Sequence, residues 1–167
     1  MKRSIAPILA TLAAACAELP SISPGLDQEP LGGEPVQLAR LQEYFPAYNS
    51  GFEERTQLVV RTQAEWEQAW RRMWKNHSPV PAAPAVDFER EVLVLAAMGT
   101  RSSGGYRVQV QHAAAHPDHV VVRVIETSPG GGCVTTAALS EPVDVARLPR
   151  TDLPIRFRVV ETVHECR

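Results

Sequence analysis

After residue 56 the chain consists mostly of short runs of β-forming residues, and the connections between neighbouring runs are short. The alternation of Tyr106, Val108 and Val110 is typical of a half-buried strand, and residues 120–125 are rich in β-branched side chains. Such connections exclude long parallel crossovers, so the sequence predicts a mostly β fold, either an antiparallel sheet or a small β-sandwich. The predicted strands are residues 57–61, 91–98, 106–112, 119–127, 134–139, 143–147 and 155–163.

One amphipathic helix is predicted between the first two of these strands. Thr62 and Glu65 have the spacing of a capping box, which satisfies backbone donors at a helix N-terminus. Large apolar side chains then recur on one stripe, at Trp66, Trp70, Met73 and Trp74. We expect this stripe to pack on the sheet, giving an α+β fold, and the prolines of residues 76–84 to end the helix. Residues 38–52 are either a covering loop or an extra strand.

Two glycine-rich segments lie beside predicted strands, at residues 100–106 and 128–133. Glycine is expected where strands reverse, because it adopts positive φ without a Cβ clash. Both segments are longer than a tight hairpin requires, and extra loop length on a rigid sheet is where recognition usually occurs. The alternative is that both are merely flexible hairpin tips.

The N-terminus has the pattern of an export signal. Lys2 and Arg3 precede an apolar stretch at residues 5–15 that is too short to span a bilayer. The stretch ends in Leu-Ala-Ala-Ala-Cys, which resembles a bacterial lipobox with Cys16 as the lipidated residue; cleavage near Ala15 by ordinary signal peptidase is the alternative. We expect an outer-membrane lipoprotein facing the periplasm or the surface, or otherwise a soluble periplasmic or secreted protein.

Two cysteines remain after this processing, Cys133 and Cys166. An even pair in an oxidising compartment predicts a disulfide, which would stabilise the fold by about 3–4 kcal/mol and fasten the second glycine-rich segment to the C-terminal strand. The enzymatic alternative uses Cys133 as a nucleophile with His164 as its base.

The expected organisation is a signal at residues 1–16, a tether at 17–35 rich in proline and glycine, and a single globular domain at 36–167. The formal net charge of −2 becomes more negative when Lys2 and Arg3 leave with the signal. This mild acidity argues against a nucleic-acid partner, which requires a basic face.

Catalytic, metal and cofactor motifs are not found in the sequence. His112, His116 and His119 straddle a turn at Pro117-Asp118, and their spacing fits no common zinc module. The chain has no G-x-S-x-G elbow, phosphate loop or H-E-x-x-H motif. We therefore expect neither an enzyme nor a bound metal or cofactor.

From residue 86 to 166 the chain resembles the C-terminal domain of the PrcB family, small bacterial secreted or lipid-anchored proteins named after a component of a surface protease complex. Strand 92–97 and the capped helix after strand 57–61 also fit this resemblance. The motifs that carry it are Val86-Asp87-Phe88, Gly99-Thr100, Gly104-Gly105-Tyr106, Thr127-Ser128-Pro129-Gly130, Gly132-Cys133-Val134-Thr135 and Pro142.

The resemblance implies a module that binds or stabilises a partner protein, in the named case a secreted protease, and it implies no catalytic residues. A more distant analogy links the loops to chagasin-like protease inhibitors, from whose motif Ser103-Gly104-Gly105-Tyr106 departs. A structural envelope lipoprotein without a dedicated partner is the other alternative.

The candidate partner-binding residues are Thr100, Arg101, Gly104, Gly105, Tyr106, Pro129, Gly130 and Gly132. Tyr106 is either a contact aromatic or a residue packed inward at the start of a strand.

Overall fold

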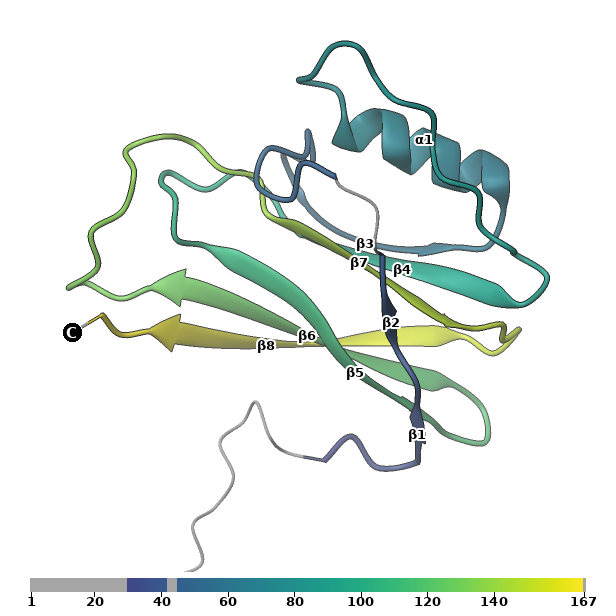
Figure 1. The fold of residues 1–167 in the computed structure, drawn as a ribbon. Helices are drawn as coiled ribbons and strands as arrows, with labels where there is room; N and C mark the ends of the chain where they lie inside the picture. Colours follow the sequence, from purple (N-terminus) through teal and green to yellow (C-terminus); the bar gives the residue numbers. More distant parts are fainter. Residues whose placement is uncertain (1–29, 42–44, 167) are drawn as a thin grey trace, which may run out of the picture.

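The computed structural model describes residues 30–41 and 45–166, which form two facing four-stranded sheets and one helix (Figure 1). Sheet A has the strand order β1-β5-β6-β8 and sheet B has the order β2-β7-β4-β3. The prediction of a mostly β sandwich with one packed helix is confirmed. The elements are β1 Glu34–Val36, β2 Ala39–Arg40, β3 Arg55–Val60, α1 Gln63–Met73, β4 Glu91–Met98, β5 Arg107–Ala115, β6 Val120–Pro129, β7 Val143–Pro149 and β8 Ile155–His164.

Strand β4 lies at the centre of the molecule and is buried on both faces. Leu93, Leu95 and Ala97 face the helix, whereas the alternate residues of β4 face sheet A. Because a strand alternates its side chains, covering both faces requires an uninterrupted apolar run, and residues 92–98 supply it. Each fully buried aliphatic side chain here stabilises the fold by roughly 1.5–3 kcal/mol relative to exposure.

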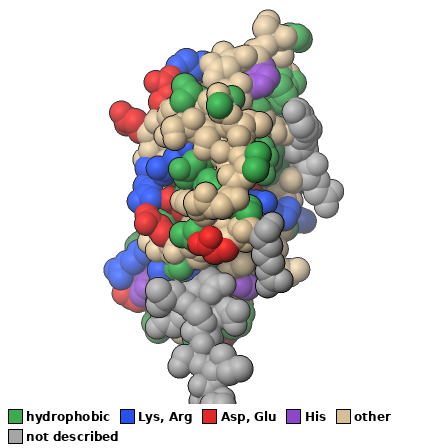
Figure 2. Space-filling view, turned by 90° about the vertical axis from the view of Figure 1, so that its left-hand side faces the viewer, with side chains coloured by type: hydrophobic (Ala, Val, Ile, Leu, Met, Phe, Trp, Pro, Cys, Tyr) green, Lys and Arg blue, Asp and Glu red, His purple; other side chains and the backbone are tan. Residues whose placement is uncertain are grey.

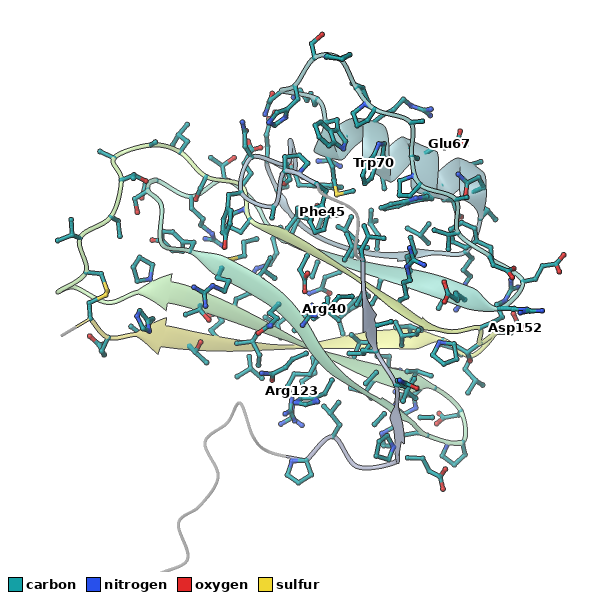
Figure 3. The ribbon with its side chains drawn as sticks, in the orientation of Figure 1. Arg40, Phe45, Glu67, Trp70, Arg123 and Asp152 are labelled. Atoms are coloured by element: carbon teal, nitrogen blue, oxygen red, sulfur yellow. A yellow bond between two sulfur atoms is a disulfide. The ribbon has the colours of Figure 1, made fainter. Side chains whose placement is uncertain are left out.

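Helix α1 packs on the outer face of sheet B, as its apolar stripe predicts. Trp66, Trp70 and Met73 are buried there, and the two indole N–H groups donate to the carbonyls of Pro84 and Pro81 at 3.0 and 2.9 Å. Figure 3 shows Trp70 and Phe45 in the layer between α1 and sheet B. The indoles therefore hold the proline-rich loop after the helix against α1.

The predicted capping box is confirmed. The hydroxyl of Thr62 accepts from the backbone N–H of Glu65, and the carboxylate of Glu65 accepts from the backbone N–H of Thr62. We expect Thr62→Ala to lower the free energy of unfolding by about 1 kcal/mol, because a backbone donor loses its acceptor. Urea unfolding followed by tryptophan fluorescence measures this change. Thr62→Ser is the matched control and should stay close to wild type.

The exclusion of parallel crossovers is wrong for one pair of strands. β6 and β8 run parallel, from Val120 opposite Ile155 to Pro129 opposite His164. Between them β7 crosses to sheet B, where it pairs with β4, and the chain then returns to sheet A in the direction of β6. A strand of the facing sheet thus makes the crossover, in the place that a helix often takes in a parallel pair.

The predicted strand at 134–139 is also wrong, because these residues form part of the loop between β6 and β7. β6 ends in sheet A and β7 begins in sheet B, so the chain needs this length to pass from one sheet to the other. The apolar residues Val134 and Leu139 are exposed rather than buried against a neighbouring strand.

The start of the globular part lies earlier than residue 36. Glu34, Pro35 and Val36 form β1, which pairs with β5 at the edge of sheet A, a position that tolerates proline. Segment 38–52 combines both predicted alternatives, since it supplies the short strand β2 and a loop whose Phe45 and Phe52 pack on the core below α1. Cys16, the predicted signal and residues 17–29 of the predicted tether lie outside the described residues.

No helix within residues 30–41 and 45–166 has the length and apolar character needed to cross a bilayer.

Candidate functional site

The two glycine-rich segments come together at one end of the sandwich. The connections 99–106, between β4 and β5, and 130–142, between β6 and β7, both pass between the sheets there, on the left in Figure 1. The backbone N–H of Gly104 donates to Thr136 at 3.0 Å, and Arg101 and Ser140 exchange backbone hydrogen bonds of 2.8 and 3.1 Å. We call these two connections the loop end. The hydrogen bonds between the two connections hold them together as one unit.

A disulfide fastens the loop end to the C-terminal strand. Cys133 and Cys166 are bridged, with their Cα atoms 5.0 Å apart, which confirms the predicted pairing. The backbone N–H of Gly130 donates to the carbonyl of His164 at 2.9 Å beside the bridge. In the bridged form Cys133 has no thiol to serve as a nucleophile.

The glycines of the loop end allow its segments to approach closely. A Cβ on Gly104 would lie 2.4 Å from the hydroxyl oxygen of Thr136, and one on Gly130 would lie 2.4 Å from Glu165 Oε2. Gly105 has φ +87°, and its Cβ would meet both Thr135 and Pro129. These three predicted contact residues thus serve packing between segments, whereas Gly132 has room for a Cβ.

Tyr106 is half-buried and packs against the core between the sheets. The guanidinium of Arg101 lies 5.7 Å from the centre of its ring and also donates to the carbonyl of Met98 at 2.8 Å. The structure therefore places Tyr106 in the inward-packed alternative, with Arg101 above it. Thr100 is exposed at the surface of the loop end, and Pro129 is partly covered beneath Gly105.

The loop end exposes large apolar side chains that the sequence analysis does not single out as contact residues. Val134 and Leu139 have exposed fractions of 101% and 74%, and Val163 near the end of β8 has 60%. Figure 2 looks onto this end and shows apolar side chains in its middle, bordered by charged ones. Among the described residues these are three of the five large exposed apolar side chains, so most of them lie at this end of the sandwich, on the loop end and the adjoining part of β8.

A charged network lies beneath the loop end and joins the two sheets. Glu126 of β6 is only 3% exposed and pairs with Arg55 of β3, which also bonds Glu161 of β8 at 2.6 Å; Arg101 lies 4.0 Å from Glu126. The hydrogen bond from Arg55 lowers the pKa of the Glu161 carboxyl. That pair therefore adds stability above the ordinary glutamate pKa and loses it as the pH falls through the lowered value.

A cavity of about 250 Å³ lies beside the loop end, where β5 and β7 begin. Asp144 lines it and accepts a hydrogen bond from the backbone N–H of Val110 at 2.7 Å and another from Arg40. Burial raises the pKa of Asp144 despite these donors. Val110 borders the β-bulge of β5, so Asp144 satisfies a backbone donor next to a break in the ladder.

The three histidines do not form a cluster able to hold a metal ion. His116 and His119 stack with ring centres 4.6 Å apart at the β5–β6 turn, and His119 Nδ1 lies 2.7 Å from Asp118 Oδ1. Their hydrogen bond lowers the pKa of Asp118. Within residues 30–41 and 45–166 no group of three or more potential ligands has a metal-binding arrangement.

A comparison with protein families matches residues 92–149 to the family described as PrcB C-terminal. The matched stretch runs from β4 to β7 and contains both connections of the loop end. No curated protein and no solved structure matches the chain. The match is shorter at both ends than the region 86–166 in which the sequence resemblance was seen. Residues 92–149 of this chain, which include the strands that carry the braced loops, are therefore similar to the PrcB C-terminal family.

Proposed function

We propose that this protein is an exported, non-enzymatic module that binds a partner protein through the loop end. The observation that carries the proposal is the pair of exposed apolar side chains, Val134 and Leu139, on a loop fastened by a disulfide and by backbone hydrogen bonds. Such bracing reduces the conformational entropy that a loop loses on binding, so more of the contact energy appears as affinity. The family name suggests that the partner belongs to a protease complex.

Export and anchoring form the second part of the proposal. The disulfide fits an oxidising compartment outside the cytoplasm. The lipobox-like run ending at Cys16 supports a lipid anchor in the outer membrane, with residues 17–33 as a spacer to the first strand. The intact mass of the membrane-bound protein tests this part, since an unacylated N-terminus or a start other than Cys16 would exclude the anchor.

Binding is tested by cross-linking and pull-down from the envelope fraction with wild type and with Val134→Asp/Leu139→Asp. We expect the double variant to recover its specific partner at least tenfold less, because two carboxylates would have to lose water in an apolar contact. Circular dichroism should show an unchanged fold, since both side chains are exposed.

The matched control is Val80→Asp, which alters an exposed valine in the proline-rich loop beside α1. It should recover the partner as wild type does. Equal recovery by all three proteins would overturn the role of the loop end. The absence of any partner above background would favour a structural envelope lipoprotein. Loss of protease activity on binding would identify an inhibitor.

A further inference from the structure

Among residues 30–41 and 45–166, strand β3 pairs with β4 and has no strand on its other edge. In the order β2-β7-β4-β3 it is the last strand of sheet B. The backbone N–H of Met98 donates to Pro142, so the even-numbered residues of β4 bond β7 and the odd-numbered ones bond β3. It follows that the backbone groups of Arg55, Gln57 and Val59 face away from β4. An added strand could bond these groups.

A groove runs between this edge and helix α1. Its volume is about 400 Å³, and its lining is mainly apolar, with Phe52, Leu58 and Val60 on one side and Ala69 on the helix. Leu58 and Val60 point toward α1, because they belong to the core on the helix side of sheet B. Ala69 is the smallest side chain of the wall. A strand added to β3 would direct every second side chain into this groove.

The two ends of the groove differ in charge. Glu65, at the end where β3 leads into α1, already accepts from the backbone N–H groups of Arg61 and Thr62. Arg72, at the other end, lies with its guanidinium carbon 4.3 Å above the ring of Phe52, and its Nε donates to the Gly51 carbonyl at 3.3 Å. This stacking holds an exposed cation beside the start of β3, where Glu53 is paired with Lys75 and a further carboxylate would be attracted to Arg72.

We propose that the groove between β3 and α1 binds an extended segment of a partner protein, which adds to β3 as an antiparallel strand and places a carboxylate against Arg72. Antiparallel addition brings the C-terminal end of the segment to the start of β3, next to that guanidinium. Three outward-facing residues accommodate a segment of about five residues. The segment would carry apolar side chains at alternate positions, and its carboxylate would be either its C-terminus or an Asp or Glu side chain. This site is separate from the loop end and goes beyond the proposed function.

Two libraries of random hexapeptides, one displayed with free C-termini and one placed between flexible linkers, test the proposal on the folded protein. We expect enrichment of alternating apolar sequences that end in a free carboxylate in the first library, or contain Asp or Glu in the second. Which library responds identifies the source of the carboxylate. Selected peptides should shift the backbone amide NMR signals of Gln57 and Val59.

The matched variants are Gln57→Pro and Gln57→Val. Gln57 is exposed, and proline there removes an outward-facing N–H without breaking the ladder to β4. We expect Gln57→Pro to weaken peptide binding by about tenfold, whereas Gln57→Val binds as wild type does. Arg72→Gln should remove the preference for a carboxylate and leave the apolar preference, which keeps the proposal testable if the proline variant does not fold.

No enrichment in either library, or equal binding by wild type and a folded Gln57→Pro, would overturn the proposal. So would amide shifts confined to other strands. The variant Val134→Asp/Leu139→Asp should bind the peptides as wild type does. The pull-down therefore tests the loop end and the peptide selection tests the groove, and either proposal can fail without the other.

Discussion

Replacing Arg55 with alanine is expected to lower the free energy of unfolding by about 3 kcal/mol. Glu126 is 3% exposed, and the longer contact with Arg101 at 4.0 Å remains when Arg55 is replaced. A buried carboxylate that loses its main ion pair keeps the cost of desolvation without the compensating attraction. Urea unfolding at neutral pH measures the change, which should appear as a lower midpoint with an unchanged slope.

Arg90→Ala is the control for this prediction. Arg90 also pairs with a carboxylate, that of Asp87 at 3.5 Å, but both side chains are exposed, so its loss should cost under about 1 kcal/mol. The double variant Arg55→Met/Glu126→Leu should regain most of the stability, because it removes the buried charge together with its partner. Equal losses from Arg55→Ala and Arg90→Ala would show that burial of Glu126 is not what makes the pair important.

Removing the disulfide with Cys133→Ser/Cys166→Ser is expected to destabilise the fold by about 3–4 kcal/mol, since the bridge closes a loop of 33 residues in the unfolded chain. The loop end should also become more mobile, because its connection to the end of β8 is lost. Hydrogen exchange should therefore quicken at the amides of Gly104 and Ser140, whose bonds brace the loops, and at that of Gly130.

The amides of β4 serve as the internal reference for this measurement, because they lie in the centre of sheet B. Under native conditions they should exchange only by global unfolding and report the loss of overall stability. If hydrogen exchange at the loop-end amides becomes faster only by the same factor as at the amides of β4, the disulfide stabilises the whole fold without bracing the loops.

Much of the fold is predictable from short-range patterns. The capping box of Thr62 and Glu65 and the stripe of Trp66, Trp70 and Met73 define α1 because helix periodicity and N-terminal hydrogen bonding are local properties. Strand β4 is recognisable because a strand covered on both faces needs an unbroken apolar run. The disulfide follows from the cysteine count and the predicted compartment.

The errors concern properties that depend on distant parts of the chain. The apolar residues of 134–139 resemble a strand, yet they form no strand ladder, and the hydrogen bond from Gly104 to Thr136 joins them to the neighbouring loop. The extension of β5 through Ala113 and Ala114 carries little β-propensity and depends on pairing with β1 and β6. The parallel pairing of β6 with β8 arises because β7 joins the other sheet, and local sequence does not specify that choice.

The candidate site shows the same division. The glycine-rich loops are recognisable from composition, but whether each of their residues is packed or exposed is not. Gly104 and Gly105 allow the neighbouring loop to approach, and Tyr106 packs inward, whereas the large exposed apolar side chains of the loops are Val134 and Leu139. Exposure depends on which segments lie beside a residue in space, so the sequence indicates the glycine-rich segments but not which of their side chains are exposed.

The parallel placement of β8 also sets an order of assembly. Until β8 follows the rest of the chain, β6 lacks its neighbour on one side, Glu126 lacks the adjoining Glu161, and Cys133 lacks its partner. A chain that emerges N-terminus first from a ribosome or a translocation channel therefore closes sheet A and fastens its loops at the same late stage. The loop end is complete only once the C-terminal strand has docked, so loss of a few residues from the C-terminus would also loosen the loop that holds Cys133.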